Sequence, residues 1–256
     1  MNYFSSKTAA ERYARGRPNF HDNTIKHIEA YLQLAGKFEN ALDVACGTGL
    51  STKALLNIAT NVYGTDISPE MLNFAPQANG IRYAIAPAEQ QPFPNSFFDL
   101  ITVSSGVHWF DIDMFLTEAN RLLKSNAWLI LYENHFIADM VGNDDFTHWF
   151  PEVYLKKFPS PPRNNAYAWT SENLTPKNFK FVAEEKFCNA VIFNKKQLAL
   201  YFTTQSNIIA AVENNQTTYE QAEEWLNQQL SSFFDNEEAT RTINYGNWIK
   251  YLQRLN

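Results

Sequence analysis

Two glycines and an aspartate have the spacing of a nucleoside-binding site. Gly47 and Gly49 follow the apolar run Ala41–Ala45, where a strand would give way to a helix. Glycine has no Cβ and takes positive φ without strain, so a ligand can lie against the bare backbone of such a turn. Asp66 ends the next apolar run, seventeen positions after Gly49, and its carboxylate can accept hydrogen bonds from both hydroxyls of a ribose. The competing interpretation is an ordinary turn and an aspartate that only ends a strand, and the matched spacing disfavours it.

The turn lacks the residues of two common phosphate-binding loops. A dinucleotide-binding turn reads G-x-G-x-x-G, and Thr52 stands where its third glycine would be. A P-loop reads G-x-x-x-x-G-K-[ST], and the residues before Lys53 do not supply its glycines. A nicotinamide-binding oxidoreductase therefore stays open only as a less favoured alternative.

Four segments carry the pattern of one enzyme family. Asp43–Gly49 resembles the motif Asp-x-Gly-Cys-Gly-x-Gly, and Tyr63–Met71 resembles hydrophobic-Gly-x-Asp-x-Ser-x-x-Met. Ala88–Asp99 is similar to the segment that leads into the fourth strand, and Glu118–Tyr132 to the helix and fifth strand that close the core. Together they resemble class I S-adenosylmethionine-dependent methyltransferases of the type 11 group. The resemblance implies S-adenosyl-L-methionine as cofactor and S-adenosyl-L-homocysteine as product.

Two shorter elements resemble a narrower group of these enzymes. Tyr13–Pro18 is similar to a Tyr-x-x-x-Arg-Pro element, and Val107–Asp111 to a His-Trp-Phe-Asp element, of enzymes like trans-aconitate methyltransferase. That group methylates small carboxylic acids. The resemblance therefore implies a methyltransferase that acts on a small-molecule acceptor, a carboxylic acid. A catalytically idle homologue that binds the cofactor is the alternative.

The resemblance places the cofactor on the N-terminal segment, the glycine turn and the ends of the following strands. The implied residues are Tyr13, Arg17, Asp43, Ala45, Cys46, Gly47, Gly49, Asp66, Ile67, Met71, Ala88, Glu89, Ser104, Ser105 and His108. The chain departs from the family pattern at Ala45, where a glycine is usual, and at Pro87, where many relatives carry an aspartate near adenine. Since proline offers neither a carboxylate nor an N–H, adenine recognition would rest on the Ala88 backbone, on Glu89 or on apolar packing.

Two residues could act on the methyl acceptor. Methyl transfer is an in-line displacement, in which the protein holds nucleophile and methyl in line and excludes water. His108 is either a general base for a hydroxyl or amine acceptor, a hydrogen-bonding wall for a carboxylate, or a structural histidine. Arg17 is either a clamp for a carboxylate of cofactor or substrate, or a lid arginine paired with surface acids. Tyr13 and Tyr3 could complete the lid, and Arg163 is a weaker carboxylate candidate.

Composition and charge narrow the class of protein. The formal net charge is −6, and the only dense basic cluster is Arg12, Arg15 and Arg17, so a nucleic-acid substrate is disfavoured. Cys46 and Cys188 offer no disulfide framework, and the five scattered histidines no metal-ligand spacing. We therefore expect no metal, no membrane span and a cytoplasmic protein. The oligomeric state is not indicated.

Apolar periodicity predicts an α/β fold with a parallel sheet wound on both faces, and the resemblance implies the doubly wound, mostly parallel seven-stranded sheet of the Rossmann-like methyltransferase fold. Apolar positions at helical spacing predict a helix over Asn23–Leu34. Strands are expected at Ala41–Ala45, Val62–Asp66, Ile81–Ala84, Leu100–Ser104 and Trp128–Glu133, and the last two come from Phe179–Val182 with Phe187–Phe193 and from Thr240–Leu252. Helices around Lys196–Gln205 and Tyr219–Phe234 would connect these last two strands.

We expect one methyltransferase domain over residues 1–256. Its parts are an N-terminal helical lid (1–36), a cofactor-binding core (37–135), an inserted cap (136–178) and the C-terminal core strands and helices (179–256). The cap prediction rests on an aromatic and proline-rich stretch that includes Trp149, Tyr154 and Trp169, because a lid over the ligand must come from loops at that sheet edge. A satellite hydrophobic cluster without a ligand is the alternative.

Overall fold

The computed structural model describes residues 6–162 and 166–256, which divide into two compact units. Unit 1 combines Met1–Pro18, His135–Pro162 and Cys188–Gly246, and unit 2 combines Asn19–Asn134, Arg163–Phe187 and Asn247–Asn256. Each unit thus gathers segments from several of the expected parts of the chain. The assignment of all 256 residues to one domain stays a prediction. Tyr3 and Arg163, two of the weaker candidates, lie outside the described residues.

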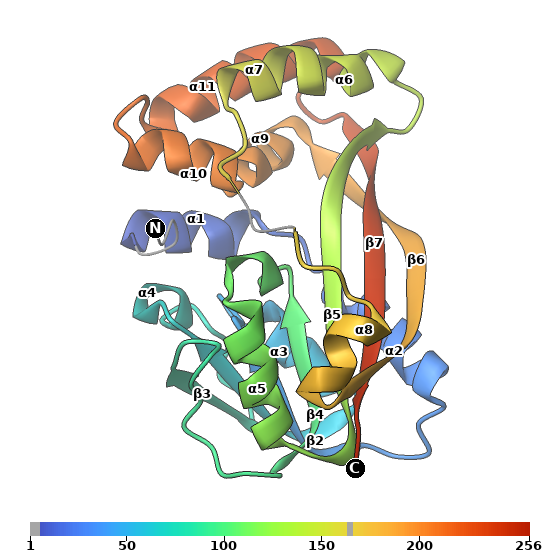
Figure 1. Ribbon diagram of the computed structural model, residues 1–256. Coiled ribbons are helices and arrows are strands. Elements are labelled where there is room, and N and C mark those ends of the chain that lie inside the picture. Colours follow the sequence, from blue (N-terminus) through green and yellow to red (C-terminus); the bar gives the residue numbers. More distant parts are fainter. Residues whose placement is uncertain (1–5, 163–165) are drawn as a thin grey trace. The chain divides into compact units, whose positions relative to one another are not determined.

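The described residues form a seven-stranded sheet in the order β3-β2-β1-β4-β5-β7-β6. The strands are β1 Phe38–Val44, β2 Ala59–Asp66, β3 Ile81–Ile85, β4 Phe98–Ser104, β5 Leu123–Met140, β6 Phe179–Asn194 and β7 Thr240–Arg254. The five strands β1 to β5 pair in parallel. The β7 strand runs beside β5 (Figure 1) in the opposite direction, since Val141 N, just beyond β5, donates to Thr242 O near the start of β7. The mostly parallel sheet is therefore confirmed, with an antiparallel end.

Alternating side chains bury both faces of the unit 2 sheet. On one face, Leu42 of β1 and Ile101 of β4 pack with α5, Ile112–Leu122. On the other face, Ala41 and Leu100, one position earlier in each strand, pack with α2, His21–Leu32, and α3, Leu50–Leu55. This alternation follows from the two-residue period of a strand. Helices thus cover both faces, as a doubly wound sheet requires.

Unit 1 is built mainly from helices with local end signals. Its helices are α1 Lys7–Gly16, α6 Asp144–Trp149, η2 Phe150–Tyr154, α7 Leu155–Lys157, α9 Lys195–Thr203, α10 Ser206–Glu213 and α11 Tyr219–Leu230. Capping boxes start two of them: Asn194 with Gln197 begins α9, and Thr218 with Gln221 begins α11. Aromatic rings fill the interior, with Phe202 at ring-centroid distances of 4.7 Å from Tyr154 and 5.2 Å from Phe136.

The structure refines the predicted elements at several points. The five parallel strands occur where expected, but β5 runs on to Met140, so that the first residues assigned to the cap continue a strand. The two runs expected within residues 179–193 form the single strand β6. The helix α10 was not predicted. The aromatic stretch divides as well: Trp149 and Tyr154 lie in the interior of unit 1, whereas Tyr167 and Trp169 pack against the core of unit 2.

The remaining short elements lie in unit 2. They are α4 Pro69–Leu72, η1 Val107–Trp109, α8 Ser171–Leu174 and η3 Thr175–Lys177; η4, Ser231–Phe233, ends α11 in unit 1. None of the helices in the described part of the chain combines the length and the apolar character that a membrane crossing requires.

Candidate functional site

The glycine turn connects β1 with α3 in unit 2, and its backbone requires both glycines. Gly47 has φ +55° and Gly49 has φ +73°. The Gly49 N–H donates to Cys46 O, which closes the turn. A Cβ on Gly49 would come within 2.5 Å of the Tyr83 hydroxyl oxygen, so a side chain there would clash as well as strain the backbone.

Two residues other than glycine take the left-handed conformation at the same edge of the sheet. Ala45 (φ +56°) directly follows β1, and Ser105 (φ +55°) directly follows the neighbouring strand β4. The two strands pair in parallel up to Val44 and Val103, so both residues stand at the carboxyl edge. A left-handed residue with a Cβ costs about 1 to 2 kcal/mol. Such strain gathers at functional sites, and here it coincides with the predicted one.

Asp43 is fully buried beneath the glycine turn. One carboxylate oxygen accepts hydrogen bonds from the hydroxyls of Ser51 (2.6 Å) and Thr52 (2.7 Å), and the other accepts one from Thr102 (3.2 Å). Burial raises the pKa of Asp43 to about 6, against the lowering effect of these three hydroxyls. The side chain therefore ties the first turn of α3 to β1 and β4. Its direct partners are protein hydroxyls, so it positions the turn.

Asp66 lies beside the glycine turn, as the spacing predicts. One of its carboxylate oxygens accepts from Gly47 N (2.8 Å) and the other from Ser68 N (2.9 Å). Burial raises the pKa of Asp66, and the backbone N–H groups of Ser68, Gly47 and Ile67 oppose that rise. A carboxylate has about four acceptor positions, so these N–H groups do not use all of them. Asp66 can therefore fix the turn and still accept a hydroxyl.

The surroundings of the turn offer both polar and apolar contacts. The hydroxyls of Thr48 and Thr65 are buried and make no hydrogen bond with the part of the chain that the structure describes. Buried hydroxyls normally have a partner, so these two suit a polar ligand. Ile67, next to Asp66, is 59% exposed although it is a large apolar side chain. Met71 is buried, and its Cε lies 3.1 Å from where a Gly47 Cβ would be.

Three further candidates are held in ways that the sequence does not reveal. Burial raises the pKa of the Cys46 thiol well above its ordinary value, and nearby Asp43 and Asp66 add to the rise, so the thiol stays neutral. Glu89 accepts a hydrogen bond from Asp111 N (2.9 Å), which commits one of its oxygens to the start of α5. Ala88 is buried in the same core as α5.

His108 lies on η1, directly after β4 and in the same unit as the glycine turn. Its ring is half-buried and packs on Trp109 at a centroid distance of 4.7 Å. Ser104, at the end of β4, pairs with Tyr132 of the neighbouring strand β5. This position at the carboxyl edge agrees with either of the ligand-facing roles considered for His108.

Arg17 belongs to unit 1, where it directly follows α1. Its guanidinium carbon lies 4.6 Å from the ring centroid of Tyr13 and 5.2 Å from that of Tyr201. Its Nη2 donates to Thr204 O (3.0 Å), while Nε is buried without a hydrogen-bond partner. Arg17 forms no ion pair with a described residue, so the pairing with surface acids is not seen among these residues and the role of Arg17 stays a prediction. No sequence signal indicates Tyr201 or Thr204 as neighbours, because both are remote in the chain.

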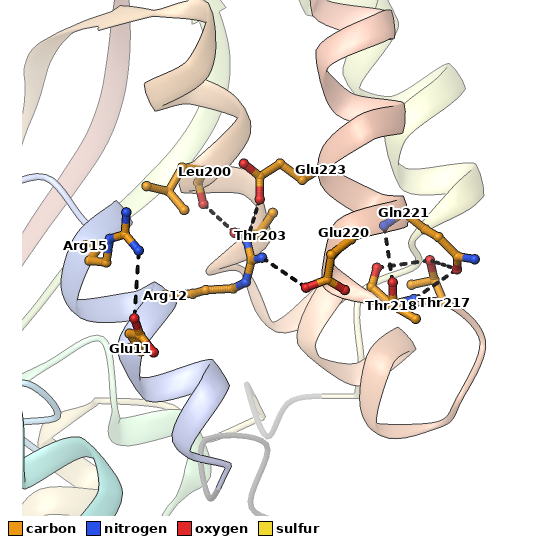
Figure 2. A network of polar contacts seen from close by, with 10 residues as sticks. All are labelled: Glu11, Arg12, Arg15, Leu200, Thr203, Thr217, Thr218, Glu220, Gln221 and Glu223. Atoms are coloured by element: carbon orange, nitrogen blue, oxygen red, sulfur yellow. Dashed lines mark hydrogen bonds and ion pairs between the residues drawn. The ribbon is translucent and has the colours of Figure 1, made fainter.

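Arg12, five residues earlier, is the arginine that pairs with acidic side chains. Figure 2 shows its guanidinium between α1 and α11, where it reaches Glu223 at 2.7 Å and Glu220 at 3.7 Å. The Arg12 side chain thus fastens α1 to α11 within unit 1.

The comparisons with known proteins agree with this geometry. Residues 42–131, which include the glycine turn, Asp66 and His108, match the family model described as methyltransferase domain. The chain carries a methyltransferase domain. The resemblance to type 11 methyltransferases is thereby confirmed, and proteins of this kind use S-adenosylmethionine.

The similarity to known proteins covers more of the chain than the residues that match the family model. A putative methyltransferase of Dictyostelium discoideum is 28% identical over 136 residues, which are 53% of this chain and 51% of that protein. The chain spans about half the length of the curated relatives it matches. A putative type II methyltransferase structure from Anaeromyxobacter dehalogenans superposes with a TM-score of 0.73 at 18% identity, covering 93% of this chain and 97% of that one.

A second similar solved structure contains S-adenosyl-L-methionine. Phosphoethanolamine N-methyltransferase 2 of Haemonchus contortus, in complex with S-adenosyl-L-methionine, superposes with a TM-score of 0.53 at 14% identity, over 98% of this chain and 58% of that one. At such identities the two solved structures establish the methyltransferase fold of the chain.

Proposed function

We propose that the protein transfers a methyl group from S-adenosyl-L-methionine to a small-molecule acceptor, a carboxylic acid. The observation that carries the proposal is the hydrogen bond from Gly47 N to Asp66, which holds a carboxylate beside a turn of two positive-φ glycines. When bound, the cofactor supplies a methyl group activated by its sulfonium charge. No metal is invoked, and no cluster of metal-ligating side chains occurs among the described residues.

The residues of unit 2 fit the cofactor. Asp66 keeps acceptor capacity for a ribose hydroxyl, and the bare backbone of the two glycines allows close approach. The exposed Ile67 side chain supplies an apolar surface for the base, which suits a chain with Pro87 in place of an aspartate. The unpartnered Thr48 hydroxyl offers a further hydrogen bond.

The acceptor is proposed to be an acid because Arg17 is a cation without a counter-charge among the described residues. A carboxylate acceptor is already ionised at neutral pH, since carboxyl pKa values lie near about 4. His108 then acts as a hydrogen-bonding wall rather than as a base. Replacement of His108 by Asn retains a hydrogen-bonding side chain and distinguishes the two roles by the pH dependence of the rate.

One observation favours a second candidate, a homologue that binds the cofactor without transferring a methyl group. Ala45 is strained at φ +56° where the family has glycine, and Pro87 removes an adenine contact. Such a protein would bind S-adenosylhomocysteine and methylate nothing. The nicotinamide alternative is less favoured still, because the Thr52 hydroxyl is committed to Asp43 within the core.

The test is calorimetric titration with S-adenosylmethionine, S-adenosylhomocysteine and NADH. We expect saturable binding of the first two, and a loss of affinity of roughly 100-fold in Asp66→Ala, because a hydrogen bond to a charged group disappears and the glycine turn loses the acceptor of Gly47 N. Asp99→Ala is the matched control: Asp99 also accepts from a backbone N–H, that of Asn40, but stands near the start of β4, away from the turn. Binding of NADH alone would contradict the proposal.

Methyl transfer itself is measured with S-adenosylmethionine labelled on the methyl group and a panel of small carboxylic acids. Label in a methylated acid supports the proposal. Tight cofactor binding with no labelled product across the panel supports the idle homologue.

A further inference from the structure

A second histidine lies at the carboxyl edge of the unit 2 sheet. His21 is the first residue of α2, and its Nδ1 lies 3.0 Å from the hydroxyl oxygen of Tyr132. Tyr132 stands where β4 ends: it pairs with Ser104, the last residue of β4, and its carbonyl oxygen accepts from Ser105 N (2.9 Å). In open α/β sheets, ligands bind outside the carboxyl ends of the strands. His21 is therefore placed at the same edge of unit 2 as the glycine turn.

Close contacts connect this place with the glycine turn. Gly106 follows Ser105, and a Cβ on Gly106 would come within 3.0 Å of the Ala45 Cβ. Ala45 directly precedes Cys46, whose N–H donates to Thr65 O (2.9 Å) at the end of β2. The segments that follow β1 and β4 thus touch each other, and β5 lies beside β4. The ends of these strands form one continuous edge, on which cofactor and acceptor would be neighbours.

A buried tyrosine holds the ring of His21. Tyr132 is 1% exposed and shares a core with Ile25 and Ile28 of α2, and its ring meets that of His21 edge to face at a centroid distance of 5.9 Å. Burial raises the pKa of Tyr132 well above its ordinary value, and the charge of Asp43 adds to the rise. The hydroxyl therefore keeps its proton and needs an acceptor. Donation to Nδ1 leaves the proton of a neutral imidazole on Nε2.

The start of α2 is also fixed by groups other than this imidazole. Thr24, three residues further along α2, accepts from Asn247 Nδ2 (3.2 Å), and both side chains are buried. His21 N donates to Asn19 Oδ1 (3.2 Å), and Asn19 Nδ2 donates to the exposed Asp22 (2.7 Å). His21 itself is only half-buried. The protein thus holds a partly exposed histidine in place without a ligand.

We propose that His21 contacts the methyl acceptor by donating its Nε2–H to the carboxylate of a small acid, and that Tyr132 positions the imidazole for this contact. The proposal rests on the proposed function and deepens it, because it adds a second donor to His108. Hydrogen bonds from an N–H to a carboxylate are stronger than those between neutral groups. One carboxylate oxygen is held in this way, while the other forms the bond to the methyl carbon as the bond from that carbon to sulfur breaks. No proton has to be removed.

Two substitutions of His21 separate a ligand contact from a structural contact. The amide nitrogen of asparagine stands close to the position of Nδ1, and that of glutamine close to the position of Nε2. His21→Asn therefore keeps a polar contact with Tyr132 and loses the donor to the acid, whereas His21→Gln does the reverse. We expect carboxylate affinity to fall by roughly 10-fold or more in His21→Asn, the worth of a hydrogen bond to a charged group. His21→Gln should retain most of the affinity but have the lower midpoint of thermal unfolding.

Affinity is measured by calorimetry on the full chain saturated with S-adenosylhomocysteine. The probes are hexanoate and phenylacetate, with hexanamide as the neutral comparison, and both carboxylates should bind more tightly than the amide. Tyr132→Phe keeps the ring and removes the hydroxyl that orients His21. We expect it to weaken carboxylate binding by roughly 5-fold, the worth of one neutral hydrogen bond. The affinity for S-adenosylhomocysteine should be the same in all these variants and the wild type.

His27→Gln is the matched control on the same helix. His27 is also half-buried, and it contacts a strand in the same manner: its Nδ1 hydrogen-bonds to Glu185 of β6, and its ring stacks on Phe187 at 3.8 Å. These contacts lie on β6, away from the end of β4. The substitution should lower the midpoint of thermal unfolding and leave carboxylate affinity unchanged.

The outcomes distinguish this proposal from the proposed function. Equal carboxylate affinity in His21→Asn and wild type, or a larger loss in His21→Gln than in His21→Asn, makes His21 a structural residue and overturns the proposal while cofactor binding stands. No carboxylate binding by the wild type overturns it as well. A parallel loss of S-adenosylhomocysteine affinity in His21→Asn assigns His21 to the cofactor instead. The expected pattern in a protein that binds no S-adenosylhomocysteine supports the contact and contradicts the methyltransferase function.

Discussion

Asp43 in unit 2 is a fully buried charge and Arg17 in unit 1 is a half-buried one, and their surroundings differ. Asp43 receives hydrogen bonds from three hydroxyls within the core. Arg17 has one carbonyl acceptor and a buried Nε without a partner. A buried charge that the protein satisfies by itself holds the backbone in place. The difference supports a structural role for Asp43 and is compatible with the binding role proposed for Arg17.

The largest expected effect is at Asp43. Asp43→Ala leaves the hydroxyls of Ser51, Thr52 and Thr102 buried without their acceptor, and each such group costs about 1 to 3 kcal/mol. Relief of the carboxylate's own burial offsets part of this cost. We expect a net loss of about 3 kcal/mol in the free energy of unfolding, measured by urea denaturation. A loss below about 1 kcal/mol would contradict the structural role.

Asp43→Asn is the control, because it keeps the shape and a carbonyl acceptor but loses the charge. The pKa of Asp43 is raised to about 6 in the folded protein, so the folded state binds more protons than the unfolded one between about pH 4 and pH 6. The stability that Asp43 contributes is present below this window and is lost as pH rises through it. The decrease in the free energy of unfolding between about pH 4 and pH 6 should be smaller in Asp43→Asn than in the wild type.

Arg17→Met should change stability in the opposite direction. The Arg17 guanidinium is half-buried and its Nε is buried without a described partner, and relief of this desolvation outweighs the loss of two ring contacts worth about 1 kcal/mol each. We expect the free energy of unfolding to rise by about 1 kcal/mol while carboxylate binding is lost, the pattern of a binding residue that costs stability. Arg12→Met, its control on the same helix, should lose about 1 kcal/mol because its ion pairs disappear. A strong destabilisation by Arg17→Met would contradict this prediction, because both arginines would then stabilise the folded protein.

The smallest effect is expected at Ala45. Ala45→Gly relieves the strain of φ +56°, and part of this gain is lost to the greater freedom of glycine in the unfolded chain. Thermal unfolding should report a gain of about 0.5 to 1 kcal/mol. Ala41→Gly, in the middle of β1 without such strain, should lose about 1 kcal/mol. A loss in both variants would show that the Ala45 backbone is not strained.

The sequence predicted the elements that depend on local rules. The short apolar runs of β1 and β4 indicated their positions, and the glycine turn and Asp66 lie beside each other at the edge where the spacing placed them. The sequence failed where local rules are weak. The single long strand β6 was divided in two, because its middle alternates exposed with half-buried residues and has no apolar core pattern. The helix α10 was missed.

The amino-acid sequence by itself determined the methyltransferase domain and its carboxyl edge. Positive φ in the glycine turn and the apolar runs of the strands both depend on residues that are neighbours in the chain. Only the tertiary structure decided which buried charges are satisfied. The partners of Asp43 include Thr102, and those of Arg17 include Tyr201 and Thr204, all remote in the chain. Whether a charge finds a partner depends on how such distant segments pack, and no spacing along the chain encodes that.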